Sequence, residues 1–164
     1  MTSTGVATAG PAPWLISWLR SFDSINGMAA SAAYGIISGS TKIFAVNGMA
    51  TVGSIGTMIS FGGYANGTVE PDGFKHITIY ATKSTEKNIA FEQALNNDNY
   101  ELIVNDILDP VNENFISMVL KNRPQLNGTK FDNGHSLFSK DAVGTFIDGF
   151  ATFNDVVNMI LTDT

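Results

Sequence analysis

Cysteine is absent from the 164-residue chain, and basic residues and long apolar runs are few. Without cysteine there is no disulfide, no thiolate metal site and no cysteine nucleophile. Nine lysines and arginines against fifteen acidic residues give a net charge of -6 and form no basic stripe, which argues against a nucleic-acid partner. The apolar run 14–18 is too short for a membrane span, so we expect a soluble, cytoplasmic protein.

Histidine is also scarce, which limits metal chemistry. His76 and His135 lie far apart in the sequence and show none of the spacings of zinc motifs. Each is interpreted as a surface or structural residue. We therefore expect no metal and no other cofactor.

Apolar residues make up 44% of the chain and charged residues 15%, which is enough to form one core. Residues 1–13 are small and polar, and we predict a flexible N-terminal arm there, followed by a single domain over 14–164. Within that domain, the tryptophan-rich stretch 14–19 is compatible with a short amphipathic helix or a strand-edge segment.

A serine among small residues is the feature that suggests chemistry. Ser31 lies in Asn-Gly-Met-Ala-Ala-Ser-Ala-Ala-Tyr (26–34), where glycine and alanine leave its hydroxyl open to a bulky reactant. A helix-compatible run follows it. A serine in this position is often only a helix cap, but the pattern also suits an exposed nucleophile, as in a serine peptidase.

Periodicity predicts an alternation of short strands and helices. The predicted elements are a helix after Ser31 that stops near 39–40, strands at 42–46 and 76–81, a loop or hairpin at 62–73, an amphipathic helix over 100–119, a helix at 139–146 capped by Ser139, and a last helix capped by Asn154. Pro110 predicts a kink or two abutting helices at 109–110, and Arg123-Pro124 should end the run. This order favours an α/β layered fold.

A serine nucleophile needs a base to take its proton. Clp-type peptidases place a histidine in a Met-Ile-His context after the serine, but this chain has Met58-Ile-Ser60 there. The alternative is a lysine that loses its charge by burial. Lys83 and Lys87 both follow the predicted strand 76–81 and are the candidates.

Three blocks in order resemble the signal peptide peptidase A family, which includes phage prohead proteases: Asn-Gly-Met-Ala-Ala-Ser-Ala-Ala-Tyr (26–34), Lys-Ile-Phe-Ala (42–45) and Val-Gly-Ser-Ile-Gly (52–56). The closing segment 138–149 also resembles the family pattern. The resemblance covers about residues 25–160. It implies a Clp/crotonase-like α/β fold with short, mostly parallel strands and flanking helices.

The resemblance also implies residue roles. Ser31 matches the family nucleophile, with its own N–H as one oxyanion donor, and Ser54 matches the serine that hydrogen-bonds the base. Lys87 is the favoured general base, and Lys83 is the alternative. Family members carry a further strand-helix-strand unit before the nucleophile, including a glycine that supplies the second oxyanion donor. With 30 residues before Ser31, we expect an N-terminally shortened member.

These features together predict a hydrolase: a serine endopeptidase that uses a Ser-Lys dyad on protein substrates, of the phage or prophage capsid-maturation type, in the cytoplasm of the bacterial host. The family forms homo-oligomeric rings, and in some members serine and lysine come from adjacent protomers. One alternative is a non-catalytic, truncated member that acts as a structural or assembly component. Another is a signal peptide peptidase.

Overall fold

The structure is a computed structural model, and it describes residues 21–162. The N-terminal arm predicted at 1–13 and the helix or strand-edge segment predicted at 14–19 lie outside the described residues. No helix within 21–162 combines the length and apolar character needed to cross a bilayer.

Two small sheets form the base of the fold. The first has the order β1-β3-β6 and consists of β1 (Phe22–Ile25), β3 (Lys42–Ala45) and β6 (Gly149–Phe150), all parallel. The second has the order β2-β4-β5 and consists of β2 (Met28–Ala30), β4 (Thr51–Gly53) and β5 (Ser136–Phe138), with β2 parallel and β5 antiparallel to β4. These mostly parallel strands confirm the predicted α/β class and the strand predicted at 42–46.

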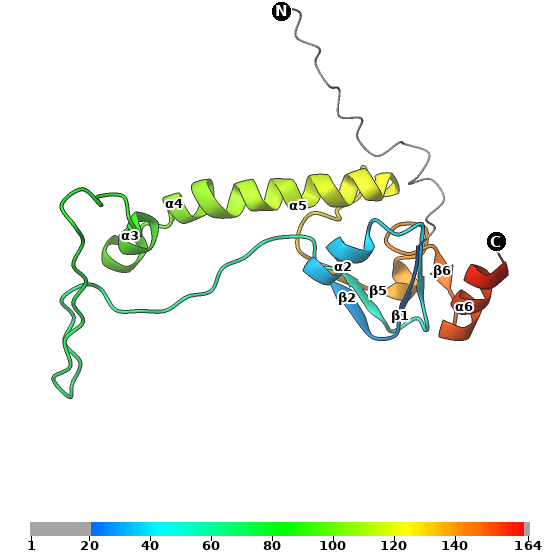
Figure 1. The fold of residues 1–164 in the computed structure, drawn as a ribbon, viewed down its shortest axis with the longest axis horizontal. Coiled ribbons are helices and arrows are strands. Elements are labelled where there is room, and N and C mark those ends of the chain that lie inside the picture. Colours follow the sequence, from blue (N-terminus) through cyan, green and yellow to red (C-terminus); the bar gives the residue numbers. More distant parts are fainter. Residues whose placement is uncertain (1–20, 163–164) are drawn as a thin grey trace, which may run out of the picture.

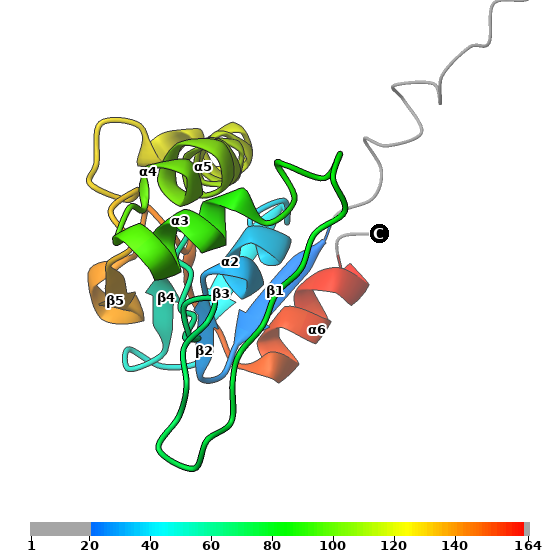
Figure 2. The ribbon, with the colours of Figure 1, turned by 90° about the vertical axis from the view of Figure 1, so that its left-hand side faces the viewer.

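Helix α2 (Ala32–Ile37) lies between the sheets and α5 (Asp109–Asn122), as both views show (Figures 1 and 2). The two helices approach closely at Gly35, where an added Cβ would lie 2.8 Å from Cε2 of Phe115. The core beneath them is apolar and includes Tyr34, Ile43, Val52, Val119 and Ile147, each 1% exposed or less. Burial of this face is what holds α2 against the strands.

The predicted break in the long amphipathic run is confirmed. Helix α4 (Glu101–Ile103) continues through a π-helical segment, η1 (Val104–Leu108), and α5 starts at Asp109. Pro110 therefore falls in the first turn of α5, directly after the π-helical segment. The helix ends at Asn122, before Arg123 and Pro124, as predicted.

Residues 57–100, which we call the extension, leave the sheets after β4 and return through α4 and α5 (Figure 1). The extension contains a hairpin with a single bridge between Val69 and Lys75, as predicted for 62–73, and helix α3 (Ile89–Asn97), which the sequence patterns did not indicate. The strand predicted at 76–81 is wrong. That segment has no neighbouring strand among the described residues, although its side chains alternate in polarity.

The C-terminal helices also differ from prediction. The helix predicted at 139–146 is wrong: only a 3-10 turn, η3 (Ser139–Asp141), forms there, and the Ser139 hydroxyl donates to the Asn47 carbonyl instead of capping a helix. A second 3-10 turn, η2 (Pro124–Leu126), follows α5. Helix α6 (Phe153–Thr162) packs on β1. Its cap is Thr152 and not Asn154 as predicted, because Thr152 exchanges hydrogen bonds with Asp155.

Candidate active site

Ser31 occupies the tight turn between β2 and α2 with a strained backbone. Its φ of 54° and ψ of -129° lie in a region that residues with a Cβ rarely adopt. The residue stands at the N-cap position of α2, yet its side chain makes no capping hydrogen bond. Its side chain is half-buried. The hydroxyl is therefore not used as a helix cap, and the strain requires another explanation.

The backbone N–H of Ser31 donates to the carbonyl of Gly53 at 2.8 Å. The expectation that this N–H is an oxyanion donor is therefore wrong, because it already has an acceptor. The N–H of Ala32 is the first one that the helix leaves without an intrahelical acceptor. It follows the serine directly and is the better candidate donor.

Ser54 follows the strand that pairs with the strand before Ser31. Ala30 pairs with Gly53 in the parallel β2-β4 ladder, so the two serines follow paired residues. Ser54 also has a positive φ, 53°, and its N–H donates to the carbonyl of His135 at 2.8 Å. It lines a cleft of about 320 Å³ together with Asn112, Asp132, Asn133 and neighbouring residues of 56–58.

An apolar cavity of about 630 Å³ opens next to Ser31. Its walls come from α2, from residues 56–59 and from the helical face that starts in η1. They include Ile36, Met58, Ile107, Leu108, Val111, Phe115 and Met118. Such a cavity suits an apolar side chain of a bound peptide. Although the helical period at 100–119 identified several of these residues as one apolar face, it did not indicate a cavity.

The candidate lysines are not near Ser31 in the single chain. Lys83 and Lys87 are exposed and lie in turns that precede α3. In Figure 1, α3 lies beyond the N-terminal end of α5, away from α2. The cavity beside Ser31 is lined by neither lysine nor histidine among the residues described. Ser31 and Ser54 thus follow paired strands and line two separate cavities, and neither cavity is lined by Lys83 or Lys87.

The histidines have other surroundings. His76 contacts Glu70 at 2.6 Å and stacks on the ring of Tyr64, all within the hairpin of the extension. His135 is exposed next to β5. Within residues 21–162, no three His, Cys, Asp or Glu side chains are arranged to hold a metal ion.

Tyr34 holds the middle of α2 in the core. Burial raises the pKa of its phenol well above the ordinary value, so the group stays protonated and donates to the carbonyl of Phe146 at 2.8 Å. Its ring also packs edge-on against the Phe146 ring. In the sequence, Tyr34 stands out only as the last residue of the serine block. Its position three residues after Ser31, on the inner face of the helix, is the signal that indicates its role.

Asp148, in the closing segment of the chain, bonds Arg123, which in turn contacts the C-terminal end of α2. Burial disfavours its charged form, but the hydrogen bonds from the Ile43 N–H and Lys42 and the positive charge of Arg123 outweigh this and hold the pKa of the carboxyl below its ordinary value. Asp148 is therefore a carboxylate that anchors β3 and Arg123. Apart from the closing motif, no pattern in the sequence indicates this network.

Comparison with known proteins shows to which family the chain belongs. No curated protein matches the sequence significantly. The model of peptidase family S49 matches residues 21–163, which include the Ser31 turn, the extension and the closing segment. A family of serine peptidases agrees with the strained serine, the apolar cavity and the parallel strands. The chain belongs to peptidase family S49.

Proposed function

We propose that the chain is a serine endopeptidase in which Ser31 is the nucleophile and a lysine from a second copy of the chain is the general base. Lys87 is the favoured base and Lys83 the alternative. The observation that carries the proposal is the conformation of Ser31: a strained, half-buried serine without a capping bond, beside an apolar cavity. Strain of this kind persists where the surrounding structure enforces it, often at active sites.

The reaction is acyl transfer to Ser31. The neutral lysine takes the proton of the hydroxyl as Oγ attacks the scissile carbonyl carbon, and then gives it to the leaving amine as the peptide bond breaks. Water, activated by the same lysine, hydrolyses the ester and frees Ser31. The Ala32 N–H faces the developing oxyanion, and Ser54 orients the lysine. The cavity binds an apolar side chain of the substrate.

The position of the lysines supports a base that acts between copies. Lys83 and Lys87 are exposed in the extension, so neither is buried within one chain. Burial against the apolar cavity of a second copy would desolvate the ammonium and favour its neutral form. We propose a closed homo-oligomeric ring, which a repeated head-to-tail contact forms when its rotation closes.

The substrate class follows from the same residues. Protein chains with apolar side chains fit the cavity, and the sequence blocks resemble those of phage capsid-maturation proteases. We therefore place the reaction in capsid maturation in the cytoplasm of a phage-infected or lysogenic bacterial cell.

Mixing two inactive variants tests the shared site. Ser31→Ala and Lys87→Ala should each abolish turnover of a peptide library, and each should fold. Co-assembled in equal amounts, they should recover about one quarter of the wild-type activity, since about one quarter of sites then combine an intact serine with an intact lysine. Lys83→Ala is the matched control and should stay active.

Three results would contradict parts of this proposal. No recovery in the mixture would place the base in the same chain as Ser31. Full activity of Lys87→Ala with loss in Lys83→Ala would transfer the role to Lys83. A fluorophosphonate probe that labels wild type and Ser31→Ala equally would remove Ser31 as the nucleophile.

One observation favours a second function, that of a non-catalytic assembly component. Among the described residues, no titratable side chain lines the cavity beside Ser31 within one chain. Wild-type protein that assembles but shows neither turnover nor labelling of Ser31 would support this function. Turnover that is lost in both Ser31→Ala and Lys87→Ala would exclude it.

A further inference from the structure

Helix α2 has six residues and is about 9 Å long, so its two ends move together. Ser31 precedes its first residue, and Ser38 follows its last. A displacement at Ser38 is therefore passed directly to the turn that contains Ser31. What holds the C-terminal end of α2 therefore also restrains the Ser31 turn at the other end.

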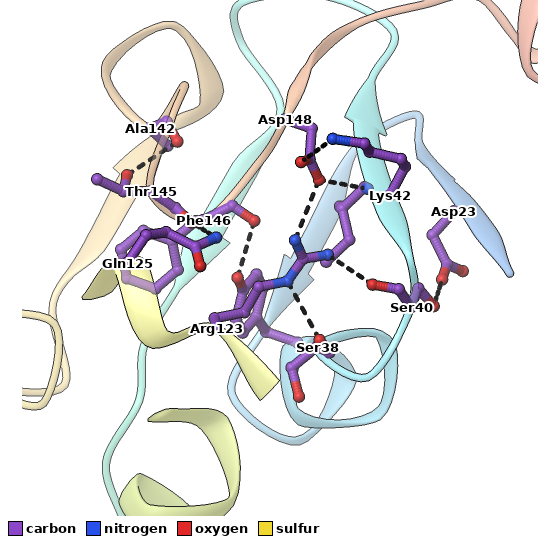
Figure 3. A network of polar contacts seen from close by, with 12 residues as sticks. Asp23, Ser38, Ser40, Lys42, Arg123, Gln125, Ala142, Thr145, Phe146 and Asp148 are labelled. Carbon is purple, nitrogen blue, oxygen red and sulfur yellow. Dashed lines mark hydrogen bonds and ion pairs between the residues drawn. The ribbon is translucent and has the colours of Figure 1, made fainter. Parts of the chain in front are cut away.

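Arg123 holds that end (Figure 3). Its side chain is 5% exposed, and its Nε donates to the Ser38 carbonyl at 3.1 Å while Nη2 donates to the Ser40 carbonyl at 3.0 Å. A cation at the C-terminal end of a helix satisfies carbonyls that have no intrahelical donor. Asn122 adds a bond from Nδ2 to the Ser38 hydroxyl at 2.9 Å.

The guanidinium is fixed from its other side. Nη1 of Arg123 contacts Oδ2 of Asp148 at 3.1 Å. The same carboxylate accepts the Ile43 N–H at 2.9 Å and the Lys42 ammonium at 3.0 Å. Arg123 thus connects the end of α5, the end of α2 and strand β3, and it does so with the planar fork that only arginine provides.

The strained backbone of Ser31 lies at the opposite end of α2. The φ of 54° at Ser31 costs on the order of 1–3 kcal/mol and needs surroundings that enforce it. The bond from the Ser31 N–H to the Gly53 carbonyl fixes one side of the turn. Tyr34 anchors the middle of α2 through its bond to the Phe146 carbonyl, and Arg123 anchors the end opposite Ser31. If that end is released, α2 can shift at its C-terminal end and the turn can relax.

We propose that Arg123 is a positioning residue for Ser31: its two hydrogen bonds to the Ser38 and Ser40 carbonyls hold the C-terminal end of α2 and thereby keep the Ser31 turn in its strained, reactive conformation. The inference rests on the proposed function of Ser31. Arg123 does not line the cavity beside Ser31, so it acts through α2 and not on the substrate.

The test compares Arg123→Met, Arg123→Lys and the control Lys121→Met, all in the full chain. Lys121 is exposed in the last turn of the same helix. The readouts are the rate of Ser31 labelling by a fluorophosphonate, kcat and KM for a peptide, the melting temperature, and the backbone amide resonances of Ser31 and Ala32.

We expect Arg123→Met to slow labelling by about 10²-fold at a temperature where it remains folded, because a misplaced nucleophile loses rate steeply. The kcat should fall and KM should change little. Arg123→Lys keeps the charge but not the fork and should recover part of the rate, to about tenfold below wild type. In both variants the Ser31 and Ala32 resonances should shift, while those of α6 stay in place. Lys121→Met should match wild type.

A folded Arg123→Met that is labelled at the wild-type rate would overturn the proposal. If Arg123→Met does not fold, Arg123→Lys decides in the same way. If wild type itself is neither labelled nor active, the proposed function fails, and the resonances then decide alone: displaced Ser31 and Ala32 signals support the positioning role, and unchanged signals overturn it.

Discussion

At the scale of residues, two serines with positive φ follow neighbouring parallel strands. Ser31 and Ser54 have φ values of 54° and 53°, and each N–H is bonded to a carbonyl of an adjacent segment. The chain thus holds two side chains with a Cβ in conformations that favour glycine. Such strain has a cost in stability, and replacement of Ser31 measures it.

We predict that Ser31→Gly is more stable than Ser31→Ala by about 1–2 kcal/mol, because both lack the hydroxyl and only alanine keeps the strained Cβ. Urea unfolding of the two variants measures the difference. The same pair at Ser60, an exposed position in the extension without a positive φ, should show no gain for glycine. An alanine variant at 31 as stable as the glycine variant would mean that the turn relaxes freely.

At the scale of elements, the contact between α2 and α5 passes through Gly35. A Cβ there would lie 2.8 Å from Phe115 Cε2 and 3.2 Å from Met118 Cε. Both side chains also line the cavity beside Ser31. The packing of the two helices and the shape of the cavity are therefore set by the same position.

We predict that Gly35→Ala lowers the free energy of unfolding by about 1–2 kcal/mol, since overpacking outweighs the gain in helix propensity. It should also displace Phe115 into the cavity and raise KM for peptides with large apolar residues. Gly27→Ala is the control, because an added Cβ at Gly27 meets no atom within 4 Å. Equal effects at both positions would show that the change acts through the unfolded chain.

The sequence was informative where an element's own residues decide its structure. Local patterns predicted the strand at 42–46, the helix after Ser31 and the break before Pro110. The spacing of apolar residues and the presence of a proline each affect the backbone at their own position. The strand predicted at 76–81 was wrong, since alternation specifies a strand only when a partner is present. The helix predicted at 139–146 was wrong because Ser139 bonds Asn47, which is distant in sequence, and Gly144 has a φ of 81°.

Only some features of the candidate site could be predicted from the sequence. Ser31 and Ser54 belong to short blocks of recognisable residues, and in the structure each follows one of two paired strands. The cavity and the role of Arg123 depend on the packing of α2 on α5, which no local pattern encodes. The distance of Lys83 and Lys87 from Ser31 depends on the path of the extension, and this also could not be read from spacing.

At the scale of the whole molecule, the extension exposes apolar surface far from the core. Ile77 and Ile79 are 62% and 86% exposed and precede the candidate lysines in the same segment. Exposed apolar residues that gather on one segment are typical of a surface that contacts a partner. A second copy of the chain is the partner that the proposed mechanism requires.

We predict that Ile79→Lys abolishes assembly and peptide turnover while it changes the unfolding free energy of the single chain by less than about 0.5 kcal/mol. Sedimentation velocity measures the first effect and thermal unfolding at low protein concentration the last. Thr82→Lys, an exposed position in the same segment, is the control and should assemble. An Ile79→Lys protein that assembles normally would remove this surface from the contact.

Helix α5 begins next to the extension and ends at Arg123, the residue that holds α2. With a second copy bound at the extension, association and the geometry of the Ser31 turn would share this one helix. Coupling free energies are reciprocal. Any molecule that binds differently to the strained and the relaxed turn would then change the affinity between copies by the same factor by which association changes its own binding.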